Sequence, residues 1–152
     1  MFNPNSMIFT SIGADHSVKN IPFVDIMKDY DPVNPKPIFV LSFHSYFRSF
    51  DYSPVEHLEI VRGMGKALRF TFTNFAGANR VLEVSPDQRI YSRDRGFVEA
   101  LRFGSMDVAI DSTGSLCKMV NRENLGFEER AMAVASVSHN HSLFVDDILV
   151  KG

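Results

Sequence analysis

The sequence predicts a single all-β domain of short antiparallel strands that spans residues 1–152. Phe occurs 14 times, Trp is absent, and Val and Ile are frequent, a composition that favours strands. Apolar and polar residues alternate over short segments, whereas helical periodicity is confined to a few turns. With 45% hydrophobic and 22% charged residues, the chain has the composition of a globular protein, and its length suits one core.

The clearest strand is 68–73, where apolar and polar residues alternate. It forms an antiparallel hairpin with 81–84, because the Gly and Asn residues between them can turn the chain. A turn at 111–114 and a tight turn at Asp146–Asp147 connect later strands, and the aromatic segment around His44 is also extended. The remaining predicted strands are 89–92, 107–110, 115–120, 142–145 and 148–150.

Three short helical segments are predicted. Apolar residues at helical spacing favour one or two turns over 21–27. Residues 54–60 are predicted to form a helical turn, with Ser53 as its cap and Pro54 in the first position. A third turn is predicted over 97–101, and the proline-rich stretch 29–37 is predicted to be a loop.

Charge and cysteine content exclude several classes of function. The net charge of −2 implies no broad electropositive face, so we expect no nucleic-acid partner. One cysteine, Cys117, excludes a disulfide framework and a Cys-built zinc site. No apolar run is long enough to span a membrane and no secretory signal precedes the domain, which together predict a cytoplasmic protein without a membrane partner. No cofactor is expected.

The order of segments from Val81 onward resembles the Hedgehog/intein (Hint) superfamily of self-processing domains. Inteins have a strand, a Thr-x-x-His turn, a second strand, a Gly-Trp pair, a short helix and a Gly-Asp turn. The matching segments here are 81–84, Ser85-Pro86-Asp87-Gln88, 89–91, Gly96-Phe97 with the residues up to 101, and 103–108.

Both ends of the chain also match. Asn140-His141 and the residues up to Gly152 are similar to the last two strands of an intein, and Met1 stands where an intein has its first Cys. Residues 19–26 resemble the helix that follows the first strand of an intein. The resemblance implies a Hint horseshoe of short antiparallel strands with one to three short helices. It also implies that the two termini lie close together near the centre, as in a mini-intein without a homing endonuclease.

The resemblance implies a set of site positions, most of which are substituted. A thioether at Met1 cannot form an ester, and Gln88 cannot shuttle protons as the family's imidazole does. Lys151 replaces the family's penultimate His, and Gly152 replaces its terminal Asn and has no side chain to cyclise. Ser85 keeps the hydroxyl of the Thr, and His141 keeps an acid or base. The implied catalytic positions are Met1, Ser85, Gln88, His141, Lys151 and Gly152.

Two functions remain open. The first is an intein-like self-processing domain that is degenerate and inactive in splicing, whose partners would be flanking segments of a host protein. The second is a repurposed binding or structural module, encoded by a phage or mobile element, with another protein as partner. Such a module should carry a contiguous exposed apolar patch away from the termini. Met1 and Gly152 are either engineered or natural, and the changes at Gln88 and Lys151 favour a natural, degenerate domain with its own start codon.

Other residues have a simpler structural interpretation beside a functional one. His139 and His141 are two apart on a predicted strand, so they share a face and could bind zinc with Asp146 or Asp147. His141 is more often a structural residue in such a position. A small enzyme built on His44 or on this histidine pair would need a deep pocket around those residues.

Three further features have mainly structural explanations. Cys117 is predicted to pack as a small hydrophobe and His44 to pack among aromatic side chains. The charged residues of the segment 87–95 are predicted to form a solvated hairpin face. These residues are Asp87, Arg89, Arg93, Asp94 and Arg95.

Overall fold

The computed structural model describes residues 1–12, 18–28, 30–34, 36–44 and 46–152. Its described residues form one antiparallel sheet of eleven strands, one α-helix and one turn of 3₁₀-helix. The strands are β1 (Met7–Ile12), β2 (Val18–Pro22), β3 (Ile38–His44), β4 (Ser49–Asn74), β5 (Asn79–Val84), β6 (Arg89–Ser92), β7 (Gly96–Glu99), β8 (Val108–Ile110), β9 (Leu116–Val137), β10 (Ser142–Val145) and β11 (Ile148–Lys151). The helix α1 spans Phe23–Lys28, and the 3₁₀ turn spans Ala100–Arg102.

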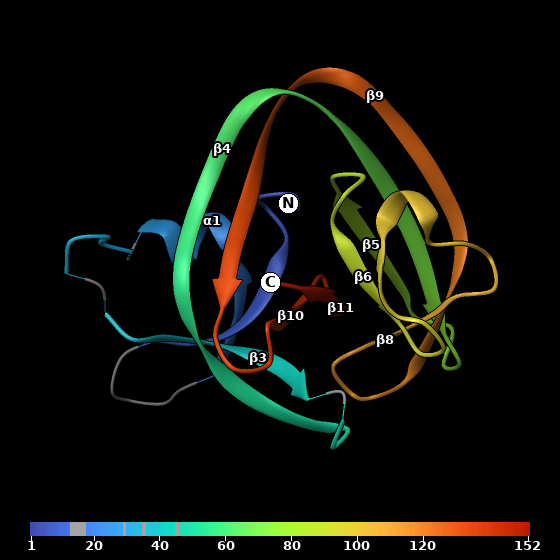
Figure 1. Cartoon of the computed structure of the whole chain (residues 1–152), viewed down its shortest axis with the longest axis horizontal. Coiled ribbons are helices and arrows are strands. Elements are labelled where there is room, and N and C mark those ends of the chain that lie inside the picture. The colour runs from blue at the N-terminus through green and yellow to red at the C-terminus, as the bar shows by residue number, and fades with distance from the viewer. Residues whose placement is uncertain (13–17, 29, 35, 45) are drawn as a thin grey trace.

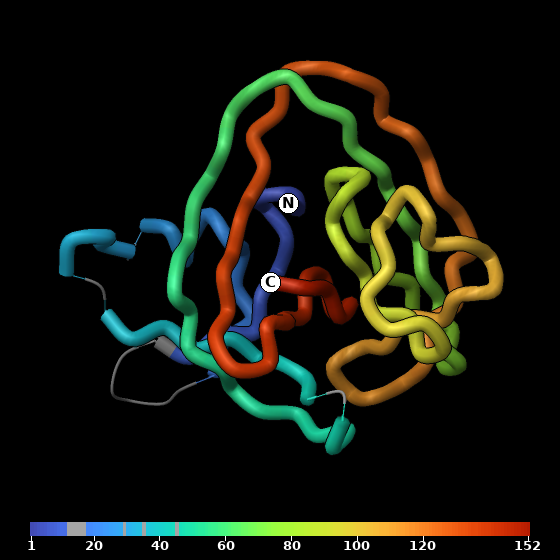
Figure 2. Tube along the Cα trace, viewed as in Figure 1, coloured from blue at the N-terminus to red at the C-terminus, as the bar shows by residue number. Residues whose placement is uncertain are grey.

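Two long strands, β4 and β9, give the molecule its shape. They pair with each other from Val55 to Asn74, and three register shifts interrupt this ladder. Because bulges bend and twist a strand pair, the ribbon curves into an arch, with β3 beside one limb and β5 and β8 beside the other (Figure 1). The chain trace shows both termini inside the arch (Figure 2).

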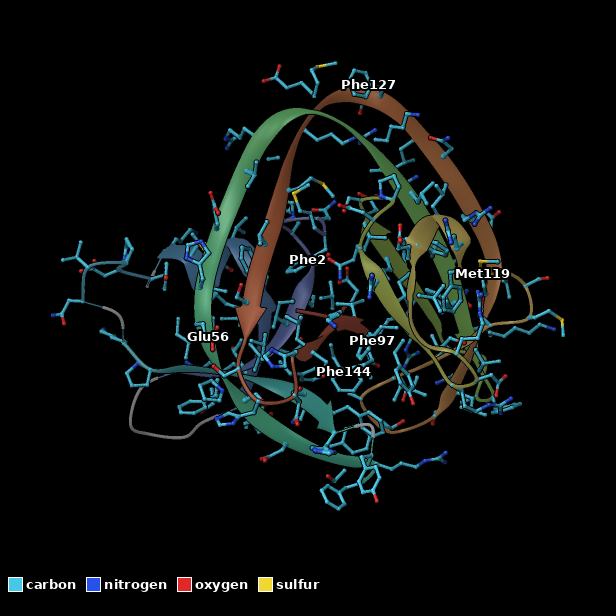
Figure 3. All side chains as sticks on the ribbon, viewed as in Figure 1. Phe2, Glu56, Phe97, Met119, Phe127 and Phe144 are labelled. Carbon is cyan, nitrogen blue, oxygen red and sulfur yellow. The ribbon has the colours of Figure 1, made fainter. Side chains whose placement is uncertain are left out.

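Aromatic side chains fill the main core. Phe70 and Phe72 of β4 stack with ring centroids 5.7 Å apart, and Phe103 meets both rings edge-on. Phe2 lies edge-on to Phe23 of α1, so the first residues of the chain belong to this core (Figure 3). A smaller cluster forms around buried Phe144 of β10. The core therefore lies on the concave side of the sheet and anchors the N-terminal segment.

The structure confirms the predicted all-β class and the strands. β4 and β5 form the expected hairpin, with Phe70 opposite Leu82, and β10 and β11 pair around the Asp146–Asp147 turn. β6 and β8 lie within a residue of their predicted bounds, and the predicted strand 115–120 is the beginning of β9. The loop predicted over 29–37 contains no helix or strand before Ile38 in its described residues, while residues 29 and 35 lie outside them.

The helix predictions are corrected by the structure. Residues 54–60 are part of strand β4, where Pro54 lies opposite Phe39 and the register shifts just beyond it. A proline is compatible with a strand next to an irregularity, so the Ser-Pro pair is no proof of a helix. Of the other two segments, 21–27 begins as β2 and becomes helical only at Phe23, and 97–101 is mostly strand β7 followed by the 3₁₀ turn. No helix in the described part of the chain is long and apolar enough to cross a membrane.

Candidate functional site

The N-terminal segment is held between two strands of the arch. The Phe2 N–H donates to the Ala133 carbonyl of β9 at 3.0 Å, and the Ala133 N–H donates back to Phe2 at 2.7 Å. On the other side, Asn3 N–H donates to the Glu83 carbonyl of β5 at 3.0 Å. These bonds place Met1 directly beside the turn that follows β5.

That turn contacts Met1 through two of the predicted site residues. The Met1 nitrogen donates to Ser85 Oγ at 3.1 Å and to Gln88 Oε1 at 2.7 Å. The Ser85 N–H donates to the Met1 carbonyl at 2.9 Å, and Ser85 Oγ donates to Asp87 Oδ1 at 2.7 Å. Burial lowers the pKa of the Met1 α-amino group, although the negative charge of Asp87 opposes this shift.

Gln88 also reaches the other end of the chain. Its Nε2 donates to the Lys151 carbonyl at 2.7 Å, while its Oε1 accepts from Met1. One side-chain amide therefore bridges the N-terminal and C-terminal segments. Such a bridge needs a donor and an acceptor on the same group, which an amide supplies at every ordinary pH.

The C-terminal residues join the same site through the backbone. The Gly152 N–H donates to the His141 carbonyl at 2.9 Å, whereas the His141 imidazole is exposed. The Lys151 ammonium lies 5.7 Å from the centre of the Phe97 ring and so is turned toward that ring. Met1, Gln88 and Lys151 line a shallow hollow of about 220 Å³. The six predicted positions are thus connected in series: Ser85 and Gln88 contact Met1, Gln88 contacts Lys151, and the adjacent Gly152 contacts His141.

Gly152 is tightly packed. A Cβ atom added to it would lie 2.6 Å from Leu143 Cδ2 and 3.1 Å from Val137 Cγ2. The first distance is shorter than the contacts that Cβ atoms make in proteins, so any larger residue at position 152 requires Leu143 to move. A side chain at the position that carries a cyclising Asn in the resembled family therefore requires Leu143 to change its conformation.

Among the described residues, His44, His139 and His141 belong to no group of metal-ligating side chains. His139 and His141 lie in the turn before β10 with positive φ angles of 61° and 51°, so the prediction that they share a strand face is wrong. In the described part of the chain, no three His, Cys, Asp or Glu side chains are grouped to hold a metal ion. His44 ends β3, accepts a hydrogen bond from the Phe47 N–H at 3.2 Å and packs 4.7 Å from the Phe47 ring. It therefore packs against an aromatic ring, as predicted, although that ring is 71% exposed.

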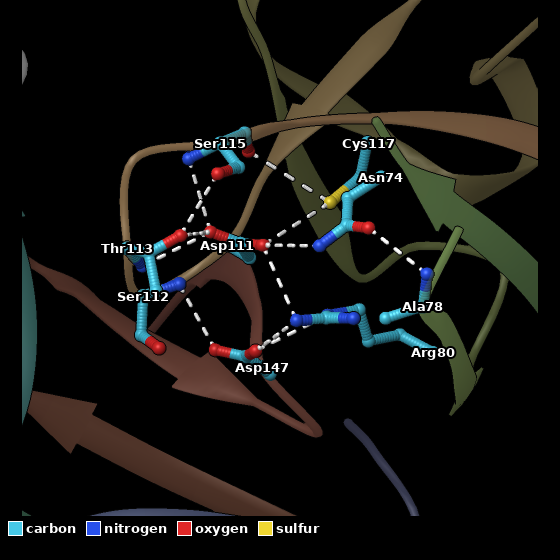
Figure 4. Close-up of polar contacts among 9 residues, drawn as sticks. All are labelled: Asn74, Ala78, Arg80, Asp111, Ser112, Thr113, Ser115, Cys117 and Asp147. Carbon is cyan, nitrogen blue, oxygen red and sulfur yellow. Dashed lines mark hydrogen bonds and ion pairs between the residues drawn. The ribbon is translucent and has the colours of Figure 1, made fainter. Parts of the chain in front are cut away.

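A buried polar cluster around Asp111 was not predicted (Figure 4). Asp111 is fully buried, and its Oδ2 pairs with Arg80 at 3.3 Å, which in turn pairs with Asp147 at 2.8 Å. Its Oδ1 accepts from Thr113 Oγ1 at 2.6 Å and from two backbone N–H groups. Burial opposes the charge of Asp111, but these hydrogen bonds outweigh it and hold its pKa below the ordinary value. The cluster is saturated with internal partners and ties the turn 111–114 to β4, β5 and the β10–β11 turn.

Cys117 lies beside this cluster and is fully buried, as predicted. Desolvation and the neighbouring Asp111 carboxylate raise the pKa of its thiol to about 12. Because the thiolate is the reactive form, we expect no reaction with a thiol-specific chromogenic reagent in the native protein at neutral pH, and full reaction in denaturant. Rapid labelling of native protein, followed by absorbance, would contradict the burial of this thiol.

The charged segment 87–95 is only partly a solvated face. Arg93 and Asp94 form an exposed ion pair, in agreement with the prediction. Arg95, however, pairs with buried Asp107, with 2.6 Å between Arg95 Nη2 and Asp107 Oδ2, and Asp87 accepts from Ser85. These two residues therefore have structural roles that the spacing of charges did not show.

The Arg95–Asp107 pair predicts a pH dependence of stability. Hydrogen bonds from Arg95, opposed by desolvation and aided by the Gly104 N–H and Ser92, lower the pKa of Asp107 from 3.8 to about 2. A lowered carboxyl pKa stabilises the folded state above pH 3.8, and this stabilisation is lost as the pH falls toward 2. Because Arg95 is half exposed, we expect Asp107→Asn to cost roughly 1–2 kcal/mol at pH 7 and little near pH 2. Urea unfolding of both proteins between pH 2 and pH 7 measures this loss of stability. A loss that is the same at every pH would contradict the lowered pKa of Asp107.

Comparisons with known proteins agree with this architecture. No protein-family model and no curated protein matches the sequence. Among solved structures, an intein from a hyperthermophile superimposes with a TM-score of 0.81 at 15% identity, covering 99% of this chain and 98% of that one. The DnaB intein of Synechocystis sp. PCC 6803 gives 0.72 at 16% identity, covering 99% and 96%. A bacterial intein-like domain from Clostridium thermocellum gives 0.68 at 18% identity, covering 97% and 99%. The chain therefore has the Hint fold of inteins and intein-like domains.

Proposed function

We propose that this chain is an intein-like domain that has lost splicing and retains the arrangement that holds its two ends together. The observation that carries the proposal is the Gln88 amide, which accepts from Met1 and donates to the Lys151 carbonyl at 2.7 Å each. An amide at this position stabilises the pairing of the ends but cannot transfer protons near neutral pH. Its partners in this proposal are host-protein segments joined to residues 1 and 152.

Three further features support loss of the chemistry. The Met1 side chain is a thioether, which cannot act as an acyl acceptor. The Lys151 side chain is turned toward Phe97, and Gly152 has no side chain; a Cβ there would collide with Leu143 Cδ2 in its present conformation. Ser85 and His141 are then remnants: Ser85 Oγ is committed to Asp87 and Met1, and His141 contacts Gly152 through its carbonyl.

The test is an intact-mass time course on the chain placed between two small carrier proteins. Without added nucleophile, and with thiol or hydroxylamine, we expect the precursor mass to stay unchanged over days. Release of either carrier, even slowly, would overturn the proposal, because Ser85, Gln88 and His141 would then still support cleavage. The Gln88→Ala variant, expected to be equally inert, controls for adventitious hydrolysis.

A repurposed binding module is the second candidate, because the chain carries an open apolar hollow away from its ends. That hollow is lined by Phe75, Val108, Leu116 and Val120 among others, and it shares no residue with the hollow beside Met1. The phage or mobile-element origin and the cytoplasmic location stay predictions from the sequence.

A further inference from the structure

Two adjacent surface hollows lie beside β8 and β9 and are together called the groove. The larger, of about 440 Å³, lies between the β4–β5 turn and the first residues of β9. The smaller, of about 180 Å³, lies between Phe50, Tyr91 and Ile110. Arg93 and Leu116 line both hollows, so the hollows are adjacent and these two residues lie between them.

The floor of the groove comes from alternate residues of one strand. Leu116, Lys118 and Val120 are two apart on β9 and so project from the same face. Cys117, between them, points to the opposite face and is fully buried. Val120 is 59% exposed, and Phe75 at the rim is 90% exposed. Large apolar side chains left open to water in one depression are typical of binding surfaces.

The described charges that line this groove are all of one sign. Among the lining residues that the structure describes, Arg48, Arg93 and Lys118 are charged and none is a carboxylate. Arg93 has a neighbouring acid, Asp94, at 3.2 Å, but this ion pair is exposed and therefore weak. Within the described residues, Arg48 and Lys118 form no ion pair with an acid. A ligand that matches this surface combines apolar groups with negative charge.

We propose that the groove binds a short, extended peptide segment of another protein, rich in Asp or Glu and carrying two apolar side chains. One apolar side chain occupies the hollow between Phe75 and Val120, and the other occupies the hollow between Phe50 and Ile110. Carboxylates of the peptide pair with Lys118, Arg93 and Arg48 along the rim. This binding is independent of the ends of the chain, so it goes beyond the loss of splicing and does not depend on it.

The experiment uses the full chain as bait for a display library of short randomised peptides. Enriched sequences are synthesised with a fluorescent label, and their affinity is measured by anisotropy. We expect the enriched peptides to combine acidic residues with aromatic or aliphatic ones. The charge-reversal variant Arg93→Glu/Lys118→Glu should bind them at least about tenfold more weakly, and Val120→Asp should have a similar effect.

A matched control carries the same change of net charge elsewhere. Lys19 and Lys36 are exposed and line neither hollow, so Lys19→Glu/Lys36→Glu should bind as the unaltered chain does. Far-ultraviolet circular dichroism and melting curves establish that every variant is folded. No enrichment above that on the charge-reversed chain, enrichment of basic peptides, or equal weakening by the control would overturn the proposal. So would a concentration-dependent dimer abolished by Val120→Asp, because the groove would then be occupied by a second copy.

Discussion

Replacement of Asp111 with alanine is expected to lower the free energy of unfolding by about 3–5 kcal/mol. The carboxylate is fully buried, and its removal leaves the partly buried Arg80 with Asp147 as its remaining acidic partner. It also removes the acceptor for three hydrogen bonds from Thr113 and Ser115 that shape the turn before β9. Donors that lose a buried partner incur their full desolvation cost.

The position of Asp111 explains why this cost should be global. Its contacts connect β8 and β9 with Asn74 at the end of β4 and, through Arg80 and Asp147, with β5 and the β10–β11 turn (Figure 4). Loss of the carboxylate therefore loosens four parts of the sheet together. Asp111→Asn keeps the shape and part of the hydrogen bonding, so it should cost less than Asp111→Ala.

Urea unfolding followed by circular dichroism measures this difference. The control is Asp94→Ala, which removes an equally charged residue whose ion pair with Arg93 is exposed. Its expected effect is within about 0.5 kcal/mol. Equal midpoints for the Asp111 and Asp94 variants would show that the buried cluster does not contribute to stability.

The Asp111 cluster also shows where prediction from sequence ended. The Asp-Ser-Thr-Gly turn was visible in the sequence. The partners of Asp111, however, are Arg80 and Asn74, 31 and 37 residues away. Only the antiparallel pairing of β4 with β5 and β9 brings these residues together. Contacts of this kind have no local sequence signal, although a lone acid between a buried strand and a turn is a reasonable candidate for them.

The strands next to the core were predictable because one face of each is buried and the other is exposed to solvent. The lengths of β4 and β9 were not predictable, because the middle of the arch extends beyond the core. Both faces are mostly exposed there, and residues such as Arg62, Glu128 and Glu129 remove the alternation that identifies a strand. The helical turn predicted after Ser53 is wrong for a different reason. A Ser-Pro pair is typical of a helix start but is equally compatible with an irregular strand.

The sequence predicted which residues of the candidate site lie near one another, but not how their side chains interact. The segments that resemble an intein placed Met1, Ser85, Gln88 and Gly152 together. In the structure Met1 contacts Ser85 and Gln88, and Gln88 contacts Lys151, the residue before Gly152. The sequence did not predict that Gln88 would bridge both ends, or that Gly152 would lie against Leu143. Those features depend on side-chain packing, which differs between proteins that share 15–18% of their residues.

The second large effect concerns recovery of activity. In the chain flanked by carriers, the double change Met1→Cys/Gln88→His is expected to release the N-terminal carrier in the presence of thiol, whereas the unaltered chain releases none. Gln88 Oε1 lies 2.7 Å from the Met1 nitrogen, so an imidazole at residue 88 is within reach of the leaving amine. The matched variant, Met1→Cys with Gln88 retained, should react at least about 100-fold more slowly, the usual contribution of a general acid.

The C-terminal half of the reaction should not recover in the same way. The change Lys151→His/Gly152→Asn supplies the missing groups, but a Cβ at residue 152 lies 2.6 Å from Leu143 Cδ2. Release of the C-terminal carrier should therefore need Leu143→Val as well, which removes the colliding methyl group at a cost of about 1 kcal/mol in stability.

Mass spectrometry distinguishes release of the N-terminal carrier from release of the C-terminal carrier. Recovery at the C-terminus without Leu143→Val would mean that Leu143 moves freely, and failure of Met1→Cys/Gln88→His would mean that the likeness to inteins ends at the fold. Recovery at the N-terminus alone would show that two substitutions, which supply a nucleophile and a proton donor, rather than a change of architecture, separate this chain from self-cleavage at that end.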